Sequence, residues 1–268
     1  MSGSTLEPLS RHLLQAAGAL SLLLILVVVN SLLNSGSESP FNPNPVAAAA
    51  ERTQEAPGMR FSMTAIYSSE SQPRTVAHGG GAYSSDSGLV QVRMRAPTSQ
   101  GQTVGVEVVG DDSSMYVRSP EFAGRLPEGK EWLEVQPELG QSDESTMAGE
   151  SFDSSLRMLA ASGGVRRVGH ARIRGARTTR YRVTVEAPEL ADVLGPIRAE
   201  AFVDDHGMLR RVRTVVTTAT DGAPVTMDMR IDLFDFGAEP DIQPPDESLV
   251  FDMTPILEEQ LDALGRES

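Results

Sequence analysis

The stretch VQVRMR (90–95) sets the pattern for most of this sequence, because apolar and polar side chains alternate along it. Side chains of a β-strand point alternately to the two faces of its sheet, so the two valines and Met94 share one face and the two arginines share the other. A register shift of one residue would bury both arginines, which makes the register well determined. The stretch predicts a strand with one apolar and one solvated face.

The same alternation recurs in VGVEV (104–108) and MDMRI (227–231), and it dominates from residue 60 onward. Residues typical of tight turns separate the alternating stretches, at 86–88, 111–114, 204–207 and 221–222. Because such turns join neighbouring antiparallel strands, we expect a mainly antiparallel sheet built in sequential order.

Three segments depart from this period and predict helices. Residues 46–54 form a short helix that begins after Pro45 and ends before Pro57. Residues 152–162 place apolar side chains at helical spacing and are followed by two glycines. A second short helix is expected at 188–194. The longer helix, 152–162, is the candidate cover for the apolar face of the sheet, so the predicted fold class is α+β, mainly antiparallel β.

The N-terminal region contains an apolar run, 16–33, that is long enough to cross a bilayer. Arg11 and His12 precede the run, and no basic residue follows it until Arg52. This asymmetry puts residues 1–15 in the cytoplasm and the rest of the chain outside. We expect a transmembrane anchor followed by a linker at 34–45, with a cleaved signal sequence as the alternative.

Composition and motifs argue against several classes of function. The formal charge of -14 argues against a general nucleic-acid binder, because neutralising phosphates requires a basic surface. No cysteine is present, the four histidines are isolated, and none of the common nucleophile, phosphate-loop or zinc motifs occurs. We expect a protein that is not an enzyme and that uses no cofactor or metal.

Two groups of residues resemble sites but have simpler interpretations. Gly79-Gly80-Gly81 lacks the strand-to-helix context of a phosphate loop, so it is predicted to be a flexible turn. The carboxylates of Asp228, Asp232 and Asp235 are expected to be solvated rather than a metal or acid–base set, because the first two alternate with apolar residues.

Positive charge is concentrated in one segment, where eight arginines and no acidic residue lie between Arg157 and Arg182. Such a segment can contact anionic lipid headgroups. The candidates for this contact are Arg166, Arg167, Arg172 and Arg174. The alternative is that acidic neighbouring strands, such as 228–232, pair with the arginines.

The predicted inner face is rich in methionine and small aliphatic side chains. Methionine adapts to irregular apolar shapes, so this face suits the acyl chain of a lipid, with an ordinary core as the alternative. The residues that contribute to the face are Met63, Ala65, Val92, Met94, Val106, Met115, Met227 and Met229.

Four motifs together resemble the LppX/LprAFG group of bacterial envelope lipoproteins, which has the LolA-like fold. They are the helix SFDSSLRML (151–159), the strand GARTTRYRV (175–183), the hairpin AFVDDHGMLRRV (201–212) and the ending DFG (235–237). The resemblance covers residues 46–253. It implies a curved half-barrel sheet whose concave face is covered by helices around a hydrophobic cavity for acylated lipids. The expected domain is 46–255, with a tail at 256–268.

The chain departs from this group because it lacks the lipidated cysteine after its signal sequence, so its anchor would be peptide rather than acyl. The expected function is binding of a lipid or other acylated ligand, by a single-pass protein of the bacterial cell membrane whose domain is extracytoplasmic. The alternative is a sensor or interaction domain that uses the same fold without lipid and binds an envelope protein. The expected cavity residues are Met63, Val92, Met94, Val106, Met227 and Met229, closed by Leu156 and Leu159.

Overall fold

The computed structural model describes residues 44–69, 74–97, 102–111, 113–122, 124–135, 164–185, 197–220 and 223–253. The predicted anchor at 16–33, the linker up to residue 43, the helices at 152–162 and 188–194 and the tail lie outside these residues. Within the described part of the chain, no helix combines the length and the apolar character needed to span a membrane.

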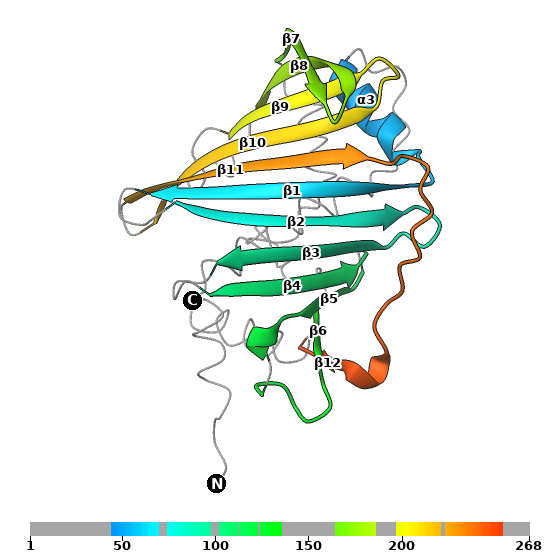
Figure 1. Ribbon diagram of the computed structural model, residues 1–268, viewed down its shortest axis with the longest axis vertical. Coiled ribbons are helices and arrows are strands. Elements are labelled where there is room, and N and C mark those ends of the chain that lie inside the picture. Colours follow the sequence, from blue (N-terminus) through cyan, green and yellow to red (C-terminus); the bar gives the residue numbers. More distant parts are fainter. Residues whose placement is uncertain are drawn as a thin grey trace, which may run out of the picture.

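The described strands form one twelve-stranded sheet in the order β12-β6-β5-β4-β3-β2-β1-β11-β10-β9-β8-β7. Consecutive strands are neighbours within β1 to β6 and within β7 to β11, and the pairing of β1 with β11 joins these two groups (Figure 1). The strands of the first half are β1 (Gly58–Ser69), β2 (Thr75–Ser84), β3 (Val90–Pro97), β4 (Thr103–Gly110), β5 (Met115–Arg118) and β6 (Trp132–Val135). Those of the second half are β7 (Val165–Ile173), β8 (Ala176–Val185), β9 (Ile197–Asp204), β10 (Leu209–Thr220), β11 (Ala223–Phe234) and β12 (Val250–Asp252).

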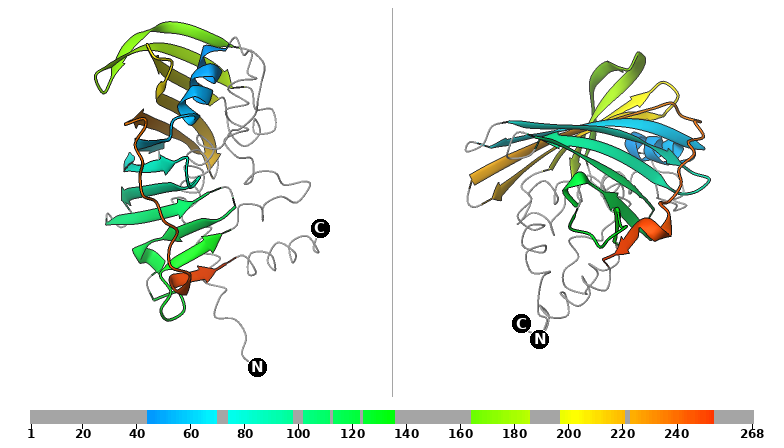
Figure 2. Two further views of the ribbon diagram at one scale, coloured as in Figure 1. Left: turned by 90° about the vertical axis from the view of Figure 1, so that its right-hand side faces the viewer. Right: turned by 60° about the horizontal axis from the view of Figure 1, so that its bottom comes forward.

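The predicted antiparallel pairing is confirmed for β1 to β11, and the predicted sequential order holds within β1 to β6 and within β7 to β11 but not between β6 and β7. The exception is β12, which pairs with β6 in parallel at one edge. The sheet is open and curved, and helix α3 (Pro45–Gln54) lies on one side of it, where it contacts β9 and β10 (Figure 2). The described fold is mainly antiparallel with few helices.

Helix α3 forms where it was predicted and begins at a well-defined cap. The Asn44 side chain accepts a hydrogen bond from the Val46 amide at 3.0 Å, which satisfies one of the free donors of the first turn. Val46, Ala49, Ala50 and Thr53 are buried, and their spacing places them on one face of the helix. The helix therefore packs on the sheet rather than extending from it.

One hydrogen bond fixes the position of α3. The Thr53 hydroxyl accepts from the Leu209 amide at 2.8 Å, and both residues are buried. The guanidinium of the preceding residue, Arg52, donates to the His206 carbonyl at 2.9 Å. Both contacts reach the turn between β9 and β10, so α3 covers that end of the concave face.

The prediction of a flexible turn at Gly79-Gly80-Gly81 was wrong, because these residues lie inside strand β2. A Cβ on Gly81 would lie 1.9 Å from the Gln91 carbonyl oxygen and 2.6 Å from Cζ of Phe61. The glycines are needed where neighbouring groups approach the strand closely. This requirement comes from β1 and β3, so the local sequence does not reveal it.

Candidate functional site

The candidate site is the concave face of the sheet, where the register aligns the predicted residues. Met63 lies opposite Gly79, Gly79 opposite Met94, and Met94 opposite Val106. Residues directly opposite each other in neighbouring strands share a face. Met63 and Met94 are 3% and 4% exposed, and Val106 is half-buried. Four strands thus contribute to one continuous row.

A second row beside the first consists mostly of small side chains. Ala65 on β1 lies between Ala77 on β2 and Met229 on β11, and Met229 lies opposite Thr214 on β10. Ala65, Ala77 and Met229 are buried. Met229, a flexible side chain, thus lies between the small residues Ala65 and Thr214 in this row.

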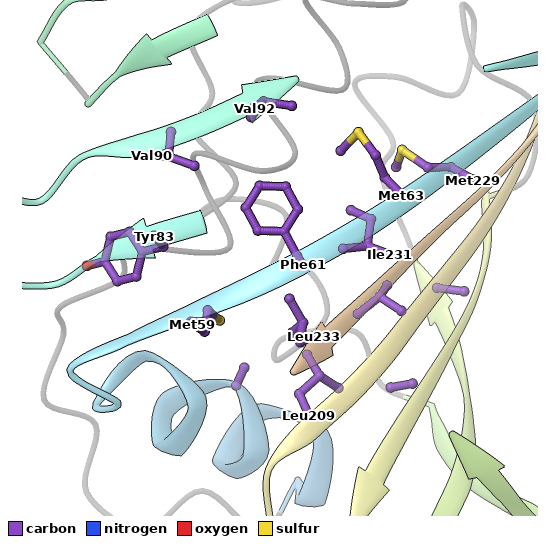
Figure 3. Close-up of a cluster of buried hydrophobic side chains, with 14 of the residues drawn as sticks. Met59, Phe61, Met63, Tyr83, Val90, Val92, Leu209, Met229, Ile231 and Leu233 are labelled. Atoms are coloured by element: carbon purple, nitrogen blue, oxygen red, sulfur yellow. The ribbon is translucent and has the colours of Figure 1, made fainter. Parts of the chain in front are cut away.

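Val92 belongs to a third row, and with it comes an aromatic residue that the sequence analysis did not select. Val92 lies opposite Gly81, which in turn lies opposite Phe61. Phe61 is 3% exposed and lies in the middle of the cluster (Figure 3). The alternation of Phe61 with Met63 and Ala65 was a signal that could have identified it.

The concave face has two ends, one near helix α3 and one farther from it (Figure 3). The α3 end comprises Met59, Leu209 and Leu233, which lie near the helix. The methionine end comprises Met63, Met94, Val106 and Met229. All of these except the half-buried Val106 are buried, and all seven belong to or pack against one cluster. The main contacts of α3 with the sheet are to β9 and β10, and Met63 and Met229 lie farther from the helix than Met59 and Leu209 (Figure 3).

The remaining predicted cavity residues are Met227, Leu156 and Leu159. Met227 is half-buried and lies opposite Tyr67 in the register, on the same face as Met229. Leu156 and Leu159, predicted to close the cavity, lie outside the described residues. Five of the eight predicted cavity residues, Met63, Val92, Met94, Val106 and Met229, therefore belong to the buried cluster or pack against it.

The convex face carries ion pairs across the central strands. Arg211 donates to Asp232 and Arg213 donates to Asp228 through two nitrogens each, with the second contact of each pair at 2.6 Å. The hydrogen bond from Arg213 holds the pKa of Asp228 below its ordinary value. The prediction that Asp228 and Asp232 are simply solvated was wrong, because the register places an arginine beside each of them.

A similar group lies on the convex face of the other half of the sheet. The Glu107 carboxylate accepts from Arg118 at 2.6 Å and from Arg93 at 2.9 Å. Burial alone would raise the pKa of Glu107, but the hydrogen bond from Arg118 and the charge of Arg93 lower it overall. The convex face is thus organised by charge, whereas the concave face is apolar.

The predicted membrane-surface arginines lie in the hairpin of β7 and β8, at one edge of the sheet (Figure 1). Arg166, Arg167, Arg172 and Arg174 are exposed. The guanidinium of Arg174 lies 3.7 Å from the centre of the Phe234 ring, so this side chain is engaged on β11. Asp228 and Asp232 pair with arginines of β10 rather than with this hairpin.

The described residues contain no group of three or more histidine, cysteine, aspartate or glutamate side chains able to hold a metal ion.

Comparison with known proteins found matches among solved structures but none among protein families or curated sequences. Lipoprotein LppX of Mycobacterium tuberculosis matches with a TM-score of 0.47 at 10% identity, over 74% of this chain and 96% of LppX. The chain is similar in structure to LppX. LprF of Mycobacterium bovis matches with a TM-score of 0.41 at 17% identity, over 79% of this chain and 99% of LprF.

A third match is MucB, solved in complex with MucA(peri), with a TM-score of 0.35 at 16% identity, over 77% of this chain and 61% of MucB. At these identities the similarity concerns the fold and assigns no ligand to this chain.

Proposed function

We propose that this chain is a non-catalytic protein of the bacterial envelope that binds an acyl chain of a lipid at the methionine end of its concave face. The observation that supports this most directly is the row of Met63, Gly79, Met94 and Val106 across four strands. Flexible methionines beside glycine and alanine can rearrange around an apolar chain without breaking hydrogen bonds.

Polarity supports the same assignment. Among the described residues of the first and second rows, Thr214 has a polar side chain, and the others are glycine, alanine, valine or methionine. A lipid chain offers no hydrogen-bonding groups, so its burial favours a lining that also has none.

The location proposed for the protein rests on the N-terminal sequence. The apolar run 16–33, with basic residues only before it, supports a single-pass anchor and an extracytoplasmic domain. We expect the full chain to remain in the membrane fraction and to be cleaved by protease added to protoplasts. Recovery of the domain in the medium, starting within 34–45, would show a cleaved signal sequence instead.

A second candidate function is a sensor or interaction domain whose concave face is an ordinary core. It is favoured by the burial of Met63, Met94 and Met229, which are only 3–5% exposed. In that case the methionines fill the space themselves, and an envelope protein rather than a lipid would be the partner.

Native mass spectrometry of the full chain, purified in a non-ionic detergent from a membrane-containing host, distinguishes the two functions. Lipid binding predicts an additional mass of one lipid that survives removal of the detergent and that fragments into acyl chains. A chain that carries no lipid, even after incubation with a total lipid extract, would contradict the proposal and favour the interaction domain.

A further inference from the structure

The hairpin of β7 and β8 concentrates positive charge that the described carboxylates do not neutralise. Residues 164–185 contain seven arginines and no acidic residue, in a chain of formal charge -14. Elsewhere on the sheet, arginines such as Arg93, Arg211 and Arg213 are paired with carboxylates. Within the hairpin, Arg180 is paired with Glu200, and Arg174 lies over Phe234.

Four of the remaining arginines lie directly opposite one another. Arg166 faces Arg182, and Arg172 faces Arg177, in the register of β7 and β8. Like charges directly opposite each other in neighbouring strands destabilise a sheet. All four side chains are exposed. The carboxylate nearest in register is that of Glu200, opposite Arg182, and its contacts are to Arg180 and Arg213.

The hairpin is held in a fixed orientation, so these charges are presented at a defined place. Arg174 adopts a positive φ of 49°, followed by Gly175 at 87°, which suits a two-residue turn. A positive φ is unfavourable for arginine, and its contact with Phe234 at 3.7 Å offsets that cost. The tip is thereby attached to β11.

The hairpin also adjoins the candidate lipid site. The cross-strand row that contains Met94 and Met63 continues through Ile231, Val212, Ala201 and Tyr181 to Arg167 on β7. Arg167 contacts the His170 ring nitrogen at 2.7 Å. Arg167 at this edge therefore lies in the same cross-strand row as the apolar residues of the concave face.

We infer that the β7–β8 hairpin docks on an anionic lipid surface, with Arg166, Arg182, Arg172 and Arg177 contacting the headgroups. This inference rests on the proposed function in that the surface would deliver or receive the bound lipid. Headgroup phosphates between the opposed arginines would relieve their repulsion. The net negative charge of the chain opposes binding to an extended polyanion that would contact much of its surface. A planar lipid surface would contact only the β7–β8 hairpin, where the charge is positive.

The test measures retention of lipid micelles by the immobilised full chain. Micelles of a non-ionic detergent contain either phosphatidylglycerol or phosphatidylcholine with identical acyl chains. Phosphatidylglycerol micelles should be retained more strongly at low salt, and the difference should disappear at high salt because salt screens surface charges. Lipid held by the concave face is expected to be insensitive to salt and headgroup.

Two matched variants locate the effect. The hairpin variant is R166Q/R172Q/R177Q/R182Q, and the control, R74Q/R95Q/R125Q/R198Q, removes four exposed arginines elsewhere. An exposed arginine near an anionic surface contributes roughly a fivefold change in binding, so the hairpin variant should lose at least about tenfold. The control should stay within about twofold of the wild type, and four lysines in the hairpin should retain binding.

Stability provides an independent readout. Removing one arginine of each opposed pair, in R166Q/R172Q, should raise the midpoint of thermal unfolding without lipid while weakening retention of phosphatidylglycerol. Equal losses in both four-residue variants, no headgroup preference in the wild type, or stronger retention of heparin than of phosphatidylglycerol would overturn the inference. Retention of both lipids equally, independent of salt, would overturn it while leaving the proposed function intact.

Discussion

The two ends of the concave face share strands β1 and β11 but differ in their distance from helix α3. At the α3 end, Leu209 is 1% exposed, and its amide is hydrogen-bonded to Thr53 of the helix. At the methionine end, Met63 and Met94 lie beside Gly79 in the register, and the main contacts of α3 are to β9 and β10. A close-packed end responds to small changes of volume, whereas flexible side chains can accommodate them. The comparison suggests that stability and ligand binding are separated along one face.

The largest expected effect is at the glycine between the two ends. In Gly81→Ala the new methyl group would meet the Gln91 carbonyl oxygen at 1.9 Å, and backbone cannot move as a side chain can. We expect a loss of more than about 3 kcal/mol in the free energy of unfolding, measured by urea denaturation. Gly105→Ala is the control, since its nearest neighbour would be 3.9 Å away. Similar stability of the two variants would contradict the close approach.

Truncation should also affect the two ends unequally. Leu209→Ala should cost about 3 kcal/mol, because α3 and the sheet cannot collapse around the cavity. Met229→Ala should cost less, about 1–2 kcal/mol, because neighbouring methionines can fill the space. Urea denaturation of the two variants gives the comparison. An equal or larger cost at Met229 would mean that both ends are close-packed.

A smaller effect is expected at Asp204, which orders the turn beneath α3. Its carboxylate accepts from the His206 and Met208 amides at 2.9 Å and from Arg210 at 2.6 Å. Burial alone would raise the pKa of Asp204, but these hydrogen bonds, that of Met208 foremost, lower it overall. Asp204→Asn keeps acceptor capacity and loses the ion pair, so we expect a cost of about 2 kcal/mol at neutral pH.

The pH dependence follows from the direction of that shift. A lowered folded-state pKa stabilises the fold above the unfolded value of about 3.9, and this contribution is lost as pH falls through the folded-state pKa. The stability difference between wild type and Asp204→Asn should therefore shrink below about pH 4. Asp205→Asn, an exposed control, should change stability by less than about 0.5 kcal/mol. A difference that is constant with pH would exclude this role for the carboxylate.

Much of this architecture could be predicted from the two-residue alternation of apolar and polar side chains. The alternation around Val92 and Met229 specified which side chains share the concave face, and the turn at 204–207 specified a hairpin. What could not be predicted depends on contacts distant in sequence. The glycines of β2 are required by Phe61 and Gln91, and the partners of Asp228 and Asp232 follow from the pairing of β10 with β11.

The role of α3 was only partly predictable. Pro45 and Pro57 indicated where the helix begins and ends, but nothing in the sequence specified that Thr53 would bond to Leu209, 156 residues away. The parallel pairing of β12 with β6 was likewise hidden, because three residues at Val250–Asp252 are too few to show a period.

The most direct test of lipid binding at the methionine end compares Met94→Phe with Leu209→Phe in the full chain. Lipid occupancy is measured by native mass spectrometry and stability by urea denaturation. We predict that Met94→Phe lowers occupancy several-fold and costs less than about 1 kcal/mol, because its ring enters space used by the acyl chain. Leu209→Phe should overpack the α3 end, costing about 1–3 kcal/mol, and leave the occupancy of the folded protein unchanged. A wild-type chain without lipid, together with a Met94→Phe variant as destabilised as Leu209→Phe, would contradict this account.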